Sequence, residues 1–111
     1  MTQEEKQLLL KDLCARLPYG VRVKQGDWEH TLESVNMYNG SFDSSCAIPI
    51  PYLRSMSNMT EEEDKELEET LQYTQFTLES YDWLNAHHFD YRGLIEKGLA
   101  LVAPEGMYKT E

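Results

Sequence analysis

The hydrophobic pattern changes its period across Pro18-Tyr19-Gly20, and this change constrains the fold more than any other feature of the chain. Pro18 cannot continue a helical hydrogen-bond ladder, and Gly20 permits a tight turn. After the turn, residues 21–25 alternate apolar and polar side chains, which is typical of a half-buried strand. Before it, apolar residues recur at spacings of three and four, as on one face of a helix: Leu9, Leu10, Leu13, Cys14 and Leu17. A helix over 2–17 followed by a sheet predicts a fold of the α+β class.

Two capping boxes predict where helices begin. In each, a threonine hydroxyl can accept the amide of an acidic residue three positions on, whose carboxylate reaches back to the threonine amide. The pairs are Thr2 with Glu5 and Thr60 with Glu63. The second box opens a helical region over 60–98, and its first helix is mostly polar, with Leu67 and Leu71 as its apolar pair.

The rest of the helical region divides into shorter segments. A second segment covers residues 77–88, with Leu78, Tyr81 and Leu84 on one face, and whether it continues the first helix is left open. A third short helix over 91–97 is expected because Asp90 can cap its start and Gly98 would end it. Two to three helices therefore follow the sheet, and a short tail over 104–111 follows the helices.

Turn signals divide the sheet region, 21–48, into strands. Gly26-Asp27 marks the first turn and Asn39-Gly40 is a hairpin signal. The segment between them changes its alternation near residues 33–34, which suggests a bulge or a strand break. A third strand is expected over 42–48, after which two prolines, Pro49 and Pro51, remove amide donors and force an edge or an irregular exit. The sequence predicts a three-stranded antiparallel meander, and closure into a small barrel is left open.

Length and charge limit the protein's class. The 111 residues are enough for a single domain over 1–111, and the hydrophobic share of 41% is that of a globular chain. The formal net charge is −10, and residues 61–70, with seven acids and one base, contribute −6 of it. Such a chain repels nucleic acid phosphates and anionic membranes, so direct partners of either kind are not expected. The acidic run is either a solvated helix face or a surface for a basic partner.

Two cysteines, Cys14 and Cys46, have apolar neighbours and no Cys-x-x-Cys spacing. We interpret them as small, reduced core residues, and a disulfide is possible only if the sheet brings them together. The chain has no signal-peptide pattern and no apolar run of membrane-spanning length. The expected location is cytoplasmic.

The densest segment in chemical terms is 81–95, which holds aromatic, histidine, aspartate and arginine side chains. Imidazole and carboxylate are ligands for divalent metals, so His87, His88 and Asp90 are candidate ligands, with Asp82 and His30 as additions. Adjacent histidines on a helix point about 100° apart, which works against a shared ion. The structural alternative places a histidine at a helix C-terminus and Asp90 at the next helix cap.

Aromatic and basic side chains suggest two binding surfaces. The segment 81–95 offers a possible partner surface made of Trp83, His88, Tyr91 and Arg92, and its alternative is core packing around Trp83, Phe89 and Tyr91. Three further residues could line a peptide groove beside an irregular strand edge: Tyr19, Tyr52 and Arg54.

Three blocks, residues 11–23, 50–62 and 82–101, carry a resemblance. They look like an uncharacterised family of small proteins from gut Bacteroidales, found among phage-like and mobile-element genes. The resemblance implies a bacterial intracellular setting. It assigns no activity, cofactor or catalytic residue, and residues 25–47 match it less well.

The sequence supports three hypotheses about function. No nucleotide-binding glycine loop, Gly-x-Ser-x-Gly elbow or His-Glu-x-x-His motif occurs, which favours a non-catalytic interaction or accessory protein with a protein partner and no cofactor. The second hypothesis is a divalent-metal-dependent hydrolase using His87, His88 and Asp90. The third is an acidic decoy of a nucleic-acid-binding protein, acting through Glu61, Glu62 and Glu63.

Overall fold

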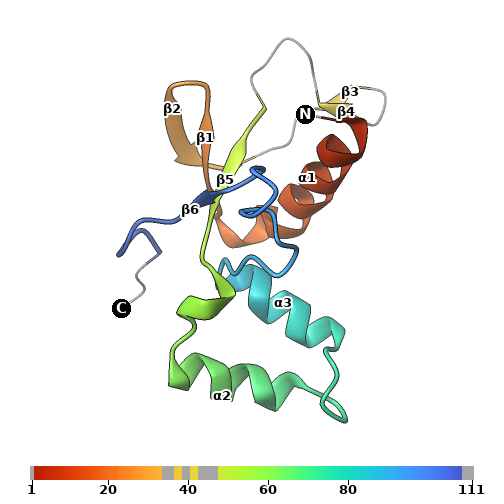
Figure 1. The fold of residues 1–111 in the computed structure, drawn as a ribbon, viewed down its shortest axis with the longest axis vertical. Helices are drawn as coiled ribbons and strands as arrows, with labels where there is room; N and C mark the ends of the chain where they lie inside the picture. The colour runs from red at the N-terminus through yellow and green to blue at the C-terminus, as the bar shows by residue number, and fades with distance from the viewer. Residues whose placement is uncertain (1, 34–36, 39–40, 43–47, 109–111) are drawn as a thin grey trace.

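The computed structural model describes residues 2–33, 37–38, 41–42 and 48–108. A long N-terminal helix, α1 (Gln3–Arg16), packs beside a small sheet, and two shorter helices, α2 (Glu61–Thr70) and α3 (Leu78–Ala86), extend from the opposite end (Figure 1). The strands are β1 (Arg22–Gln25), β2 (Trp28–Thr31), β3 (Met37–Tyr38), β4 (Ser41–Phe42), β5 (Ile50–Leu53) and β6 (Leu101–Val102). Short 3-10 turns, η1 (Leu17–Tyr19) and η2 (Met56–Asn58), precede β1 and α2. The predicted α+β class is confirmed.

Helix α1 begins and ends at its predicted signals. Thr2 accepts the Glu5 amide at 3.1 Å and donates its own amide to the Glu5 carboxylate at 2.8 Å, which is the predicted capping box. After η1, Gly20 takes a left-handed φ of 70°, which glycine adopts without steric cost. Cys14, however, is exposed, so its assignment to the core is wrong. Cys46 lies outside the described residues.

The sheet differs from the predicted meander. Its strand order is β2-β1-β5-β6, in which β1 pairs antiparallel with β2 and β5, while β5 pairs parallel with β6. The expected third strand over 42–48 begins in β4, which pairs antiparallel with β3 as the hairpin signal predicts, but these two strands form a separate sheet, and residues 43–47 lie outside the described residues. Among the strands that the structure describes, β2 and β6 are the edges of an open sheet rather than neighbours in a barrel.

Pro51 lies inside the sheet instead of ending it. It is fully buried in β5, opposite Val23 of β1. The parallel ladder with β6 begins one residue later, opposite Tyr52, so the residue without an amide is left out of that ladder. Pro51 therefore lies in an interior strand, and the predicted alternative of an edge position is wrong.

The helical region contains two helices, which is the lower end of the predicted two to three. The second capping box, Thr60 with Glu63, opens α2 as predicted, and Thr77 caps α3 after a tight turn that separates the helices. Residues 91–98 form turns and not the expected helix. Asp90 still acts as a cap, because its carboxylate accepts the amides of Leu94 at 2.8 Å and Ile95 at 3.0 Å.

Two apolar clusters hold these elements together. The larger joins α1, the sheet and the segment after α3, through the buried residues Leu9, Leu13, Val21, Val23, Leu32, Leu53, Leu94, Leu99 and Ala100. The smaller, made of Leu67, Leu84 and Phe89, joins α2 to α3. The α2–α3 pair thus has its own small core, and one face of α2 remains toward solvent.

Candidate functional site

The segment 81–95 is a structural corner that begins with the end of α3. The Phe89 amide donates to the Leu84 carbonyl at 3.0 Å and the His88 amide to the Asn85 carbonyl at 3.1 Å, which together form a Schellman motif. His88 takes the left-handed position of this motif, with a φ of 63° where glycine is most common. The predicted helix end near His88 is confirmed.

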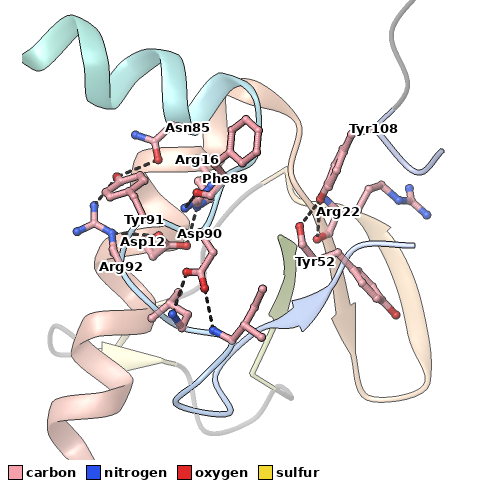
Figure 2. A network of polar contacts seen from close by, with 12 residues as sticks. Asp12, Arg16, Arg22, Tyr52, Asn85, Phe89, Asp90, Tyr91, Arg92 and Tyr108 are labelled. Atoms are coloured by element: carbon pink, nitrogen blue, oxygen red, sulfur yellow. Dashed lines mark hydrogen bonds and ion pairs between the residues drawn. The ribbon is translucent and has the colours of Figure 1, made fainter. Parts of the chain in front are cut away.

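His88 is buried and neutral. Its side chain is 8% exposed and its ring stacks on Tyr108, with centroids 3.7 Å apart. Burial, aided by the nearby charge of Arg16, lowers its pKa to about 4. Its Nδ1 atom is buried without a hydrogen-bond partner among the described residues. Tyr108 continues inward, because its hydroxyl donates to the Tyr52 carbonyl at 2.6 Å, and so ties the tail to the sheet (Figure 2).

A buried polar network joins this corner to α1 (Figure 2). Asp12 accepts from Nε of Arg16 at 2.8 Å and from Nε of Arg92 at 3.0 Å. Arg16 also donates to the Phe89 carbonyl at 2.6 Å, and Arg92 donates to the Tyr91 hydroxyl at 2.9 Å. Asp12 and Arg16 are completely buried. The network fixes the corner on the helix and leaves little of it open to a ligand.

The hydrophobic pattern of the sequence does not indicate Asp12 or Arg16 as buried residues. The buried face of α1 is Leu9, Asp12, Leu13 and Arg16, which is a regular spacing of three, one and three. The predicted stripe differed because a hydrophobic pattern counts charged residues as solvent-facing. The signal that could have found them is an opposite-charge pair four residues apart inside an apolar stripe.

The metal-ligand candidates do not converge. His87 caps the end of α3, His88 stacks on the tail, and the Asp90 carboxylate is held by two backbone amides. Asp82 is exposed, and His30 bonds the Gln25 side chain in the β1–β2 hairpin. Within the described ranges no three His, Cys, Asp or Glu side chains are grouped so that they could hold a metal ion. The hydrolase hypothesis gains no support from this geometry.

The predicted partner surface is mostly part of the corner packing. Trp83 stacks between His87, at a centroid distance of 4.1 Å, and Phe89, at 5.8 Å. Tyr91 and Arg92 are half-buried members of the polar network, and His88 is buried. The packing alternative accounts for the contacts that these side chains make.

Arg54 joins the sheet to α2 rather than lining a groove with Tyr19 and Tyr52. Its guanidinium forms two bonds to the Glu63 carboxylate, at 2.7 and 2.8 Å, and lies 4.2 Å from the Phe89 ring centroid. The hydrogen bonds from Arg54 lower the pKa of Glu63 to about 2. Tyr52 is engaged separately, since its hydroxyl donates to Glu29 at 2.9 Å. Beside the Arg54–Glu63 pair lies an open hollow of about 940 Å³, which His87, His88 and Tyr108 also line.

A second hollow lies on α2, and we call it the α2 groove. It has a volume of about 510 Å³. Its lining combines apolar residues, Met56, Met59, Leu67, Leu71 and Phe76, with Thr60 and three exposed acids, Glu61, Asp64 and Glu68. A groove with apolar lining residues and acidic side chains at its border can bind an amphipathic helix that carries basic residues.

Four large apolar side chains in or just after the α2–α3 connection are exposed. We call this group, Tyr73, Phe76, Leu78 and Tyr81, the hairpin tip. Tyr73 is 90% exposed and Leu78 is 85% exposed, followed by Phe76 at 43% and Tyr81 at 41%. The predicted apolar face of α3 is therefore only partly correct, because Leu84 is buried while Leu78 and Tyr81 are not. Phe76 belongs both to the hairpin tip and to the α2 groove.

No helix in the described part of the chain is long and apolar enough to cross a bilayer. The resemblance to small proteins of gut Bacteroidales stays a prediction. Comparison of the chain with protein-family models, with curated proteins and with solved structures finds no match.

Proposed function

We propose that the protein is a non-catalytic interaction module that binds a basic amphipathic helical segment of a partner protein in the α2 groove. The observation that carries the proposal is the combination of an acidic side on α2 with apolar lining residues from η2, α2 and the α2–α3 connection. Helix-in-groove recognition uses apolar anchors at spacings of three and four, and a basic flank would complement the rim.

The rim charges are free to pair with a partner. Glu61, Asp64 and Glu68 lie three and four positions apart, so they project from one side of α2. None of the three forms an ion pair within the part of the chain that the structure describes. The same charges oppose docking of a second copy of this face, because like charges across an interface are unfavourable.

The size of the groove indicates weak affinity. Three buried apolar anchors contribute roughly 5–9 kcal/mol, and association itself costs about 4–15 kcal/mol. The rim attractions add a salt-dependent contribution. The most favourable balance of these two figures is about 5 kcal/mol, so we expect a dissociation constant on the order of 0.1 mM at low salt.

The test uses two fluorescein-labelled helical peptides of about 18 residues with leucines on one face. The other positions are lysine in the first peptide and glutamate in the second. Fluorescence anisotropy should show binding of the basic peptide only. The groove variant Glu61→Gln/Asp64→Asn/Glu68→Gln should weaken it about tenfold. The matched control replaces three exposed acids of the same helix outside the groove lining, Glu62→Gln/Glu66→Gln/Glu69→Gln, with the same change in net charge.

Equal weakening by the two triple variants would overturn the proposal, because binding would then follow net charge and not the groove. A floor variant, Phe76→Ala, adds a second criterion. The decoy hypothesis requires acidic charge alone, so it predicts no effect of Phe76→Ala. Binding in the groove predicts a loss of about tenfold, because a bound helix would cover the exposed Phe76 ring.

A further inference from the structure

The hairpin tip contains a strained turn that displays a tyrosine. Gln72 and Gln75 exchange two backbone hydrogen bonds of 3.0 Å, so Tyr73 and Thr74 are the central residues of a two-residue turn. Their φ angles are 53° and 64°, as a type I′ turn requires. Asn-Gly is the favoured pair in such a turn, and tyrosine and β-branched threonine are poor choices for it. The chain accepts strain here although both side chains are exposed.

The tip does not use Tyr73 for its own packing. With a side chain 90% exposed, Tyr73 buries almost no surface, and Leu78, 85% exposed, buries little more. Phe76 and Tyr81 contact each other edge to face, with centroids 5.6 Å apart, and both remain partly exposed. A group of exposed apolar side chains on a small protein marks an interaction surface.

The charge around the tip selects the chemistry of the partner. No lysine or arginine stands between Lys65 and Arg92, while Glu68, Glu69 and Glu79 flank the exposed side chains in the sequence. The ring face of an exposed tyrosine attracts a cation, and the guanidinium of arginine stacks on it better than an ammonium does. Phe76 connects the tip to the α2 groove, so one bound segment can contact both.

We propose that the hairpin tip is a specificity element for the same basic partner, in which Tyr73 receives an arginine side chain through its ring face. This inference rests on the proposed function of the α2 groove. The tip adds a preference for arginine over lysine that the acidic rim alone does not provide.

The test compares a leucine–arginine peptide with the leucine–lysine peptide by fluorescence anisotropy. Wild-type protein should bind the arginine peptide about threefold to tenfold more tightly, a range set by a cation–π contact. Tyr73→Asn/Thr74→Gly installs the favoured turn pair and should raise the Tm by roughly 4 °C or more while abolishing the arginine preference. Thr74→Gly alone relaxes the turn, keeps Tyr73, and should keep the preference.

The outcomes separate this inference from the proposed function. If neither peptide binds wild-type protein, both proposals fail. If the groove variants weaken binding but the double turn variant keeps the arginine preference, only the role of Tyr73 is overturned. A double variant that is less stable than wild type would also overturn it, because lost structure would then explain lost binding.

Discussion

Replacement of Asp12 by alanine should be among the most destabilising single changes in the described part of this protein. Asp12 is completely buried and accepts hydrogen bonds from two guanidinium groups, those of Arg16 and Arg92. Arg16 is also completely buried, and its Nη1 atom has no hydrogen-bond partner among the described residues. Without Asp12, the Arg16 guanidinium keeps one backbone acceptor, the Phe89 carbonyl.

The magnitude follows from the different burial of the two arginines. Breaking a buried ion pair by removing one partner costs about 3–5 kcal/mol, since the remaining charge is neither paired nor hydrated. The Arg92 side chain is 18% exposed, so it can recover hydration, and its lost bond adds about 1 kcal/mol or less. A total of about 4 kcal/mol is a large part of the 5–15 kcal/mol that stabilises a typical domain.

Urea unfolding followed by far-UV circular dichroism measures this cost. At a slope of about 2 kcal/mol per molar urea, the midpoint of Asp12→Ala should fall by about 2 M. The matched control is Asp82→Ala, at an exposed acid of α3, which should stay within about 0.5 kcal/mol of wild type. The apolar replacement Asp12→Leu/Arg16→Met should recover most of the loss. A midpoint shift below about 0.5 M for Asp12→Ala would refute the reasoning.

Three further predictions concern single side chains. Because Arg54 holds the pKa of Glu63 at about 2, below its ordinary 4.5, the pair stabilises the fold above pH 4.5 and this stability is lost as the pH falls toward 2. Glu63→Gln should therefore lower the free energy of unfolding by about 1 kcal/mol at pH 7. Calorimetry should also show that its Tm falls less than that of wild type between pH 4.5 and pH 2. Burial holds the pKa of His88 at about 4, below 6.5, so its neutral form stabilises the fold above pH 6.5, and this contribution falls between pH 6.5 and 4. His88→Gly removes that titration and suits the left-handed φ of 63°, so its Tm should fall less than that of wild type over this pH range. Cys14 should react with iodoacetamide in native protein, and peptide mass mapping that finds it protected until unfolding would contradict its exposure.

Local signals in the sequence predicted the helix boundaries well. The capping boxes of Thr2 and Thr60 involve residues three positions apart, and the stop after α1 depends on Pro18 and Gly20 alone. Such signals act within one turn of chain, so the folded environment does not alter them. Asp90 shows the limit of this reasoning, because it caps the following amides although no regular helix follows.

The order of the sheet depends on contacts that no local pattern contains. Strand β5 pairs with β1 although it follows the predicted third strand in the sequence. Strand β6 has only two residues, Leu101–Val102, so it is too short to show an alternation. Pro51 indicated an edge because it lacks an amide, yet the offset of the parallel ladder by one residue allows it an interior place. Strand pairing is a property of the whole chain, and hydrophobic alternation specifies a strand without specifying its neighbours.

The α2 groove lies on the acidic run, for which the sequence left open both a solvated helix face and a surface for a basic partner. α2, all of whose residues the structure describes, buries Leu67 alone. It is held at its ends instead: Arg54 binds Glu63 near the start, and at the other end the Thr70 hydroxyl donates to Ser80 at 2.8 Å. Because contacts at both ends hold α2 in place, few of its other side chains need to be buried. Its acidic side and the half-buried Leu71 beside it therefore stay open, which is the condition that a groove for a basic helix requires.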